Sequence, residues 1–196
     1  MHGRPISKVL NYYYLPTAID SSVSEVIVNQ LSHLKLEEAT VTESGKDSGN
    51  SNKTIRNCLT QGIPSDHWVS GMLAHFVNCA NSNLFHFDLH NWADFLHLCV
   101  YDKKGSHYDW HTDISSALYS HPENHVRKLS ISLCLSSKDE YDGGEFQLYV
   151  GRKMYNFKMN CGDAIIFPAD CMHRVRKIKS GSRKSLVGWY GGPQFR

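Results

Sequence analysis

Tyr108-Asp-Trp-His-Thr-Asp113 is the most informative stretch of this chain. His111 and Asp113 stand two residues apart on a predicted strand, so both side chains point to the same face. An imidazole beside a carboxylate supplies two of the three protein ligands of a facial metal site. The sequence therefore predicts a metal site on this strand, with the third ligand on a different strand.

The candidate for the third ligand is His173, in the segment Phe167-Pro-Ala-Asp-Cys-Met-His-Arg-Val175. It stands on a predicted strand that follows the turn signal Cys161-Gly-Asp163. Two neutral imidazoles and one carboxylate leave one face of an octahedral ion open. This ligand set suits a redox-active Fe(II) that must bind a co-substrate and dioxygen together.

A cation follows in the segment Ser182-Arg-Lys-Ser-Leu-Val-Gly-Trp189. The turn at 179–181 is expected to fold this strand back on the strand of His173, so that His173, Arg183 and Ser185 face one interior. Fe(II) with one carboxylate keeps a single positive charge, so a dicarboxylate co-substrate would bring a surplus negative charge. A buried guanidinium would neutralise that charge and hold a carboxylate bidentately.

Strand-like runs fill the chain from residue 84 onward, separated by glycine turns. They lie at 85–89, 95–101, 107–113, 128–135, 146–150, 154–159, 164–168, 173–178 and 185–190. Helical spacing of apolar residues occurs only upstream, at about 22–33 after a capping-box pattern and at 66–81. This order predicts a mainly β fold, an antiparallel sandwich or barrel packed against N-terminal helices.

The composition is that of an ordinary globular chain. Its 196 residues fit one domain, and 41% hydrophobic with 20% charged residues exclude a disordered, fibrous or coiled-coil protein. Lys and Arg number 21 against 19 Asp and Glu, a net charge of +2. Broad binding to a nucleic-acid backbone is therefore not expected.

The cysteines indicate a reducing environment. No two of them form a C-x-x-C pair, and their scatter favours free thiols over disulfides. They are Cys58, Cys79, Cys99, Cys134, Cys161 and Cys171. Residues 1–10 lack the apolar core of a secretion signal, and no apolar run is long enough to span a membrane. These features predict a soluble, cytoplasmic protein with no membrane partner.

An ordered set of motifs carries a family resemblance. It comprises Tyr101-x3-Gly105-x2-Tyr108-x2-His111-x-Asp113, Gly143-Gly144-Glu145, Gly162-Asp163-x3-Phe167-Pro168, His173-x-Val175 and Gly181-x-Arg183-x5-Trp189. Together with Ile55-Arg56-Asn57, these motifs cover roughly residues 55–192. That part of the chain resembles the Fe(II)/2-oxoglutarate-dependent dioxygenases, specifically the prolyl 4-hydroxylase superfamily, and within it the PKHD-type hydroxylases.

The resemblance implies a double-stranded β-helix, or jelly roll. Residues 1–196 would form a single dioxygenase domain, with helical support at about 1–83 and the jelly-roll core at about 84–192. The roles that the resemblance implies are iron binding by His111, Asp113 and His173, binding of the distal carboxylate of 2-oxoglutarate by Arg183, a co-substrate contact by Tyr101, and pocket positions for Tyr108 and Ser185. No catalytic side chain is expected beyond the metal centre.

The activity implied by the resemblance is hydroxylation of a peptide or protein, prolyl residues included, or of a small molecule. Dioxygen would be consumed and 2-oxoglutarate decarboxylated to succinate, with ascorbate as a reductant. Related oxygenases that act on proline often carry a tyrosine near the position of Cys134. Some co-substrate contacts are therefore expected to differ here.

Two other functions stay open on the residues alone. An oxygenase of the same chemistry could demethylate nucleic-acid bases; the basic cluster around Arg174 and Arg176 favours this and the near-neutral charge opposes it. A non-enzymatic jelly-roll module could also hold a metal, but it would not need all four key positions. His121 and His125 have the spacing of a metal pair, although Pro122 between them favours a solvated loop.

Overall fold

The computed structural model describes residues 12–41, 51–114 and 125–194. The two α-helices are α1 (Ser21–Leu31) and α2 (Trp68–Ala80), the latter continued by a π-helical turn, η1 (Asn81–Phe85). The strands are β1 (Tyr13–Leu15), β2 (Glu37–Glu38), β3 (Arg56–Asn57), β4 (Leu59–Ile63), β5 (Asn91–Trp92), β6 (Leu96–Tyr101), β7 (His107–His111), β8 (His125–Cys134), β9 (Tyr141–Gly143), β10 (Phe146–Val150), β11 (Lys153–Phe157), β12 (Ala164–Pro168), β13 (His173–Val175), β14 (Ile178–Gly181) and β15 (Arg183–Pro193).

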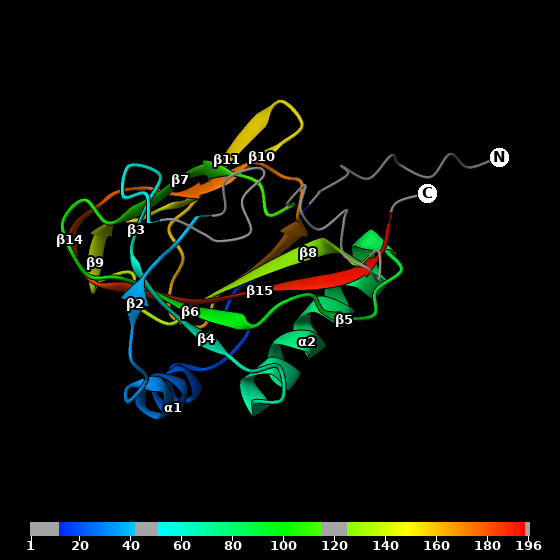
Figure 1. Cartoon of the computed structure of the whole chain (residues 1–196), viewed down its shortest axis with the longest axis horizontal. Coiled ribbons are helices and arrows are strands. Elements are labelled where there is room, and N and C mark those ends of the chain that lie inside the picture. Colours follow the sequence, from blue (N-terminus) through cyan, green and yellow to red (C-terminus); the bar gives the residue numbers. More distant parts are fainter. Residues whose placement is uncertain (1–11, 42–50, 115–124, 195–196) are drawn as a thin grey trace.

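These strands form two antiparallel layers, as the double-stranded β-helix requires. The larger sheet runs β1-β12-β8-β15-β6-β4-β2, with β5 beside β15, and the smaller sheet runs β11-β10-β13-β7-β3. A two-stranded ribbon pairs β14 with β9. Figure 1 shows the layers stacked, with β7 and β10 above β8 and β15. The predicted jelly-roll fold is confirmed.

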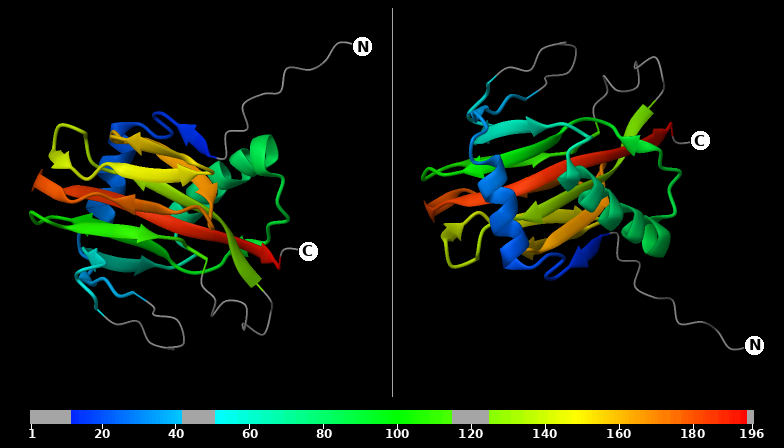
Figure 2. Two further views of the ribbon diagram at one scale, coloured as in Figure 1. Left: turned by 90° about the horizontal axis from the view of Figure 1, so that it is seen from above. Right: turned by 90° about the horizontal axis from the view of Figure 1, so that it is seen from below.

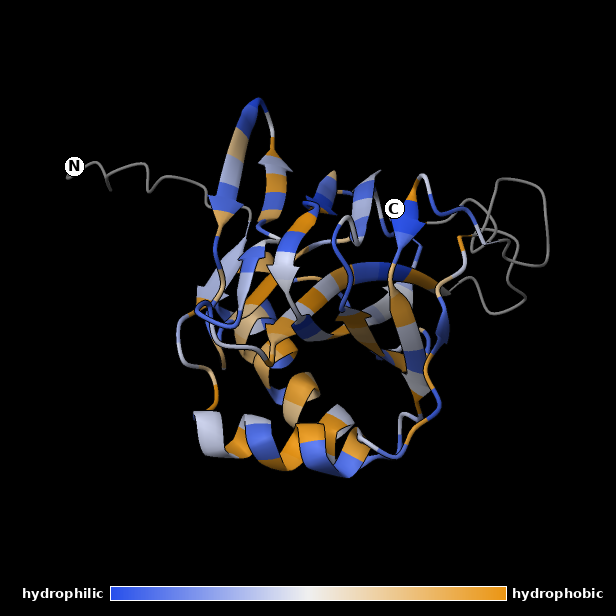
Figure 3. Ribbon diagram, turned by 90° about the vertical axis from the view of Figure 1, so that its left-hand side faces the viewer, coloured by the Kyte–Doolittle hydropathy of each residue, from blue (hydrophilic) through white to orange (hydrophobic). Residues whose placement is uncertain are grey.

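Both helices cover the outer face of the larger sheet (Figures 1 and 2). Ile27 of α1 and Leu73 of α2 are completely buried in a cluster with Leu129 and Leu133 of β8. Side chains alternate along a strand, so Ser130 and Ser132 point into the space between the sheets. One face of β8 thus builds the core and the other faces the interior. Figure 3 shows apolar and polar bands following one another along the strands of the molecule.

The two sheets pack on each other through a second apolar cluster. It includes Tyr101 of β6, Phe146 and Leu148 of β10, and Ile165 and Phe167 of β12. On β12 the neighbouring Ala164 and Ile166 face the helices instead. Because both faces of the larger sheet are covered, its strands β6 and β12 are mainly apolar along their length, which made them easy to predict.

Several sequence expectations are wrong in detail. The strand expected at 85–89 is absent, because Asn81 binds both the backbone N–H and the carbonyl of Phe87, at 2.8 and 2.9 Å, and holds the chain in a turn. Residues 141–143, which lie outside the strands expected from the sequence, form β9. The segment expected to be helical support supplies four strands, β1 to β4, so the sheets begin well before residue 84.

Other expectations hold. The two predicted helices are present within one or two residues at each end, and all six cysteines are free. Within the described residues, no helix is long and apolar enough to cross a membrane. The pair His121 and His125 lies outside the residues whose side chains the structure describes.

Gly162 is required where the turn before β12 meets the start of α1. Its φ is +85°, and a Cβ there would lie 2.0 Å from the carbonyl oxygen of Ile19. We expect Gly162→Ala to destabilise the fold by about 2–4 kcal/mol, because backbone strain and the clash add. Thermal unfolding measures this, and Gly71→Ala is the matched control, since a Cβ on that α2 glycine meets nothing within 4 Å. Equal melting temperatures for both variants would contradict the argument.

Candidate metal centre

Pairing of β7 with β13 brings two distant histidines together. His111 and His173 are direct partners in this antiparallel pair, and their ring centroids lie 4.1 Å apart. Asp113 follows the end of β7, where its backbone N–H donates to the carbonyl of Ala169 at 2.8 Å. The predicted strand thus ends at His111, but the Asp113 side chain still joins the two imidazoles.

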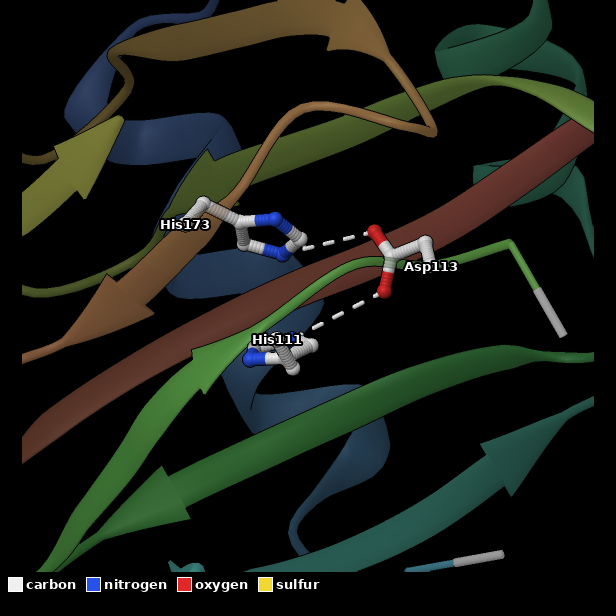
Figure 4. A group of neighbouring side chains, drawn as sticks. All are labelled: His111, Asp113 and His173. Atoms are coloured by element: carbon white, nitrogen blue, oxygen red, sulfur yellow. Dashed lines mark ion pairs between the residues drawn. The ribbon is translucent and has the colours of Figure 1, made fainter. Parts of the chain in front are cut away.

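The three side chains converge on one point (Figure 4). One carboxylate oxygen of Asp113 lies 3.7 Å from Nε2 of His111, and the other lies 3.4 Å from Nε2 of His173. All three candidate donor atoms lie within 4.8 Å of one another. The group could therefore hold a single metal ion, and we call it the His–Asp–His cluster.

Backbone hydrogen bonds fix which ring nitrogen each histidine offers. Nδ1 of His111 lies 2.7 Å from the carbonyl of Asp109, and Nδ1 of His173 lies 3.0 Å from that of Cys171. A carbonyl only accepts, so each Nδ1 carries the proton. The lone pairs of both Nε2 atoms therefore face Asp113, which is the arrangement that a metal-binding imidazole needs.

Burial keeps the cluster in the right charge state for a cation. Burial, reinforced by His173, lowers the pKa of His111 to about 3, so its ring is neutral at physiological pH. Burial would raise the pKa of Asp113, but the two histidines and a hydrogen bond from Ser130 outweigh it and hold the pKa below its usual value. A neutral imidazole and an ionised carboxylate need lose no proton on binding a metal.

Two residues of β8 hold Asp113 in place. The Ser130 hydroxyl donates to Oδ2 of Asp113 at 2.7 Å, and Arg127 donates to its backbone carbonyl at 3.3 Å. Arg127 itself is stacked 4.0 Å from the ring of Trp189 and bonded to Asp94 at 2.9 Å. These contacts leave the carboxylate little freedom to rotate away from the imidazoles.

The cluster opens into a pocket between the two sheets. Tyr108 lines it with its ring stacked 3.5 Å from that of His111. Tyr101 and Ser185 line it from the larger sheet. The structure thus places all three predicted co-substrate neighbours in the same pocket as the cluster.

Arg183 lies directly behind the pocket wall, 1% exposed. It pairs with Tyr101 across β15 and β6, and its Nη1 donates to the Ser185 hydroxyl at 3.0 Å. Its Nε has no hydrogen-bond partner, and the described residues offer it no ion pair. A buried cation without an anion is costly, so this position fits a ligand that brings its own carboxylate.

One step of the sequence argument is wrong. The strand of Arg183 does not fold back on the strand of His173, because β14 pairs with β9 and carries the chain from the smaller sheet to the larger one. β15 instead lies between β8 and β6. Arg183 and His173 therefore approach the same interior from opposite sheets.

The donor set and the arginine fit the groups that the sequence implies. Two imidazole nitrogens and one carboxylate on one side of a pocket leave coordination positions for further ligands, as Fe(II) oxygenases require. A dicarboxylate could reach from such an ion toward the unpaired guanidinium of Arg183. No other group of three His, Cys, Asp or Glu in the described residues could hold a metal ion.

Comparison with known proteins agrees with this fold. The sequence profile described as the 2OG-Fe(II) oxygenase superfamily matches residues 96–191 of this chain. The chain is also similar to PKHD-type hydroxylases. One from Crocosphaera subtropica is 32% identical over 123 residues, which is 62% of this chain and 54% of the relative.

A second relative, a PKHD-type hydroxylase of Prochlorococcus marinus, is 43% identical over 61 residues, covering 31% of this chain and 28% of its own length. The chain thus spans about half or less of the curated relatives it matches. A solved prolyl-4-hydroxylase of Pseudomonas putida superposes with a TM-score of 0.69 and 17% identity over 94% of both chains.

Another solved structure, a Trichoplax adhaerens prolyl hydroxylase in complex with a hypoxia inducible factor peptide fragment, gives a TM-score of 0.71 at 15% identity. It covers 92% of this chain and 83% of the other. At such identities these neighbours establish the shared fold.

Sequence reasoning missed Ser130 and assigned no role to Arg56. Ser130 belongs to an alternation of serines with Leu129, Ile131 and Leu133 on β8, a pattern that marks a strand with one polar inner face. That signal could have placed it in the pocket. Arg56 gave no such signal, because β3 has only two residues and its position depends on pairing with β7.

Proposed function

We propose that this chain is an Fe(II)- and 2-oxoglutarate-dependent dioxygenase that hydroxylates its substrate and releases succinate and carbon dioxide. The observation that carries the proposal is the His–Asp–His cluster at a pocket whose other wall, on the larger sheet, covers a buried arginine without an ion-pair partner among the described residues. Fe(II) bound with 2-oxoglutarate would supply the oxidising chemistry that no side chain of the chain can supply.

The chain's own residues would bind and orient the metal ion and 2-oxoglutarate. His111, Asp113 and His173 would hold the ion through Nε2, a carboxylate oxygen and Nε2. Arg183, with Ser185 fixing one of its N–H groups, would receive the distal carboxylate of 2-oxoglutarate. Tyr101 and Tyr108 would form the pocket walls beside the co-substrate, where burial raises the pKa of each phenol and keeps it a neutral hydrogen-bond donor.

For the substrate, we propose a peptide or protein, with prolyl residues first among the candidates, ahead of a free small molecule. The names of the relatives and the peptide complex of a structural neighbour support this order. Neither base demethylation nor a non-enzymatic metal-binding module is favoured by the comparisons. The free cysteines support a cytoplasmic location, and ascorbate would keep the iron reduced.

The test is direct. Anaerobic addition of Fe(II) and 2-oxoglutarate to the protein should produce a visible absorption band, and air should then start succinate formation. Mass-shift screening of proline-containing peptides against oligonucleotides should find an added oxygen in the peptide panel. Absence of both the band and succinate would refute the proposed chemistry, and demethylation of an oligonucleotide would replace the proposed substrate.

Ser130→Ala should weaken iron binding by about 10–100-fold, because the hydroxyl that orients the Asp113 carboxylate is lost. Calorimetric titration with Fe(II) under nitrogen measures the loss. Ser132→Ala is the matched control, since Ser132 is buried on the same face of β8 without a hydrogen bond to Asp113, and its iron affinity should equal that of the parent. Identical iron affinities for the two variants would show that Ser130 does not support iron binding.

A further inference from the structure

A second buried arginine faces the pocket from the opposite sheet. Arg56 begins β3, at the edge of the smaller sheet, where it pairs with Tyr108 of β7. Its guanidinium carbon lies 4.6 Å from the centre of the Tyr108 ring, which in turn stacks on His111. Arg56 is 8% exposed and lines the same pocket as the His–Asp–His cluster. Its charge therefore lies one aromatic ring away from the candidate metal ligands.

The hydrogen bonds of Arg56 are few and weak for a buried guanidinium. Nη1 donates to the carbonyl of Thr40 at 3.2 Å, Nη2 contacts the sulfur of Cys99 at 3.6 Å, and Nε has no partner. A guanidinium carries five N–H donors, so most of them are unused. Within residues 12–41, 51–114 and 125–194, no carboxylate lies within 4 Å of this side chain.

The groups around Arg56 do not neutralise it. Burial raises the pKa of Cys99 to about 12 and also raises that of Cys58, so both remain uncharged thiols. On its other side Arg56 borders a surface hollow with Glu38 and Asp102. Glu38 is paired with Lys53, and Asp102 forms no ion pair with Arg56. The positive charge of Arg56 is thus uncompensated by the described residues.

Counting charges shows what is missing. Fe(II), the Asp113 carboxylate, the Arg183 guanidinium and a 2-oxoglutarate dianion together carry no net charge. Arg56, which is buried, then adds one positive charge, and an unpaired charge is strongly unfavourable in a buried position. Arg183 belongs to β15 of the larger sheet and Arg56 to β3 of the smaller sheet. Because the two cations lie on opposite sheets, we expect each to bind a different anionic group.

Building on the proposed function, we propose that Arg56 receives a carboxylate of the primary substrate, so that this oxygenase acts on an anionic substrate. The planar fork of arginine suits bidentate capture of a carboxylate. That carboxylate can belong to a free or N-acylated amino acid, or to an acidic residue next to the target residue in a peptide. The position of Arg56 beside Tyr108 and His111 places the anion close to the site of reaction.

Binding can be measured without turnover, on the full chain loaded with Mn(II) and 2-oxoglutarate under nitrogen. Two matched pairs of probes separate the two sources of carboxylate. The first is N-acetyl-L-proline against N-acetyl-L-prolinamide, and the second is an end-blocked peptide with Pro-Asp against the same peptide with Pro-Asn. We expect the acid of at least one pair to bind at least 10-fold more tightly than its neutral counterpart, as calorimetry would measure.

Arg56→Gln should abolish that preference, leaving acid and amide with equal affinity, while 2-oxoglutarate affinity changes less than about 2-fold. Arg152→Gln, which replaces an exposed arginine beyond β10, should retain the full preference. Arg56→Lys keeps the charge but not the fork and should retain part of it. If Arg56→Gln does not fold, the proposal is still tested by the acid preference of wild type and by its partial loss in Arg56→Lys.

Three results would overturn this inference. The first is equal binding of the acid and neutral probes by wild type, including no binding of either. The second is an acid preference that survives in Arg56→Gln. The third is loss of 2-oxoglutarate affinity in Arg56→Gln, which would assign Arg56 to the co-substrate. Failure of the proposed function is a separate outcome, since it would appear as wild-type protein that forms no succinate with Fe(II) and 2-oxoglutarate.

Discussion

Asp113→Ala should abolish iron binding and turnover together, because it removes the only anionic donor of the His–Asp–His cluster. Loss of a residue that only hydrogen-bonds a metal ligand lowers metal affinity by about 10–100-fold. Loss of the carboxylate ligand itself should therefore lower iron affinity by more than about 100-fold. The two imidazoles would remain, with their Nε2 atoms facing the space that the carboxylate had filled. Calorimetry with Fe(II) under nitrogen and a succinate assay measure the two losses.

Two controls sharpen this experiment. Asp113→Asn keeps the shape and the contact with Ser130 but not the charge, so it should lose iron nearly as fully if charge is what matters. Asp142→Asn removes an exposed carboxylate that pairs with Lys179 at 3.4 Å on the β9–β14 ribbon, and should bind iron like the parent. Wild-type iron affinity in Asp113→Ala would show that the cluster is not the metal site.

The local part of this site could be predicted because His111 and Asp113 are two residues apart in the sequence. An extended chain points two such side chains to the same side whatever the strand pairs with, and this holds here although β7 ends at His111. The central strands of the larger sheet were predictable for a similar reason, since apolar runs such as 96–101 and 164–168 are legible without their partners.

What could not be predicted depends on pairing between distant segments. The register that sets His173 opposite His111, and the route of β14 that sends Arg183 to the other sheet, follow from which strands meet. A one-residue slip in pairing would turn every side chain of a strand to the other face, and the sequence alone does not fix that choice. Strands of two or three residues, such as β1 and β3, are too short to show a period at all.

Arg183 and Arg56 also show why a buried charge is informative only when its surroundings are known. In the sequence each is one basic residue among 21. In the structure both are buried, and each has an Nε without a partner. Burial of these two cations without an anion lowers the stability of the fold, and binding of an anionic ligand offsets that loss. The apo protein is therefore expected to be less stable than the protein with 2-oxoglutarate bound.

Replacing Arg183 should separate co-substrate binding from iron binding. Arg183→Ala should leave iron bound but raise the 2-oxoglutarate concentration required by about 10-fold or more, because a charge-assisted bidentate contact is lost. Arg183→Met, which fills more of the space, should lose affinity equally. Titration of 2-oxoglutarate into the Mn(II) form measures the loss, and Lys179→Ala, exposed on β14, should behave like the parent.

The melting temperature of Arg183→Met provides a second test of the role of Arg183. Without ligand, Arg183→Met removes an unpaired buried charge and puts an apolar chain of similar length against Tyr101 and Met159. Such replacements are often neutral or stabilising, so its melting temperature should equal or exceed that of the apo parent. Adding Mn(II) and 2-oxoglutarate should then raise the melting temperature of the parent far more than that of the variant. A variant that loses stability without ligand yet keeps 2-oxoglutarate affinity would make Arg183 a structural residue and leave the co-substrate without its anchor.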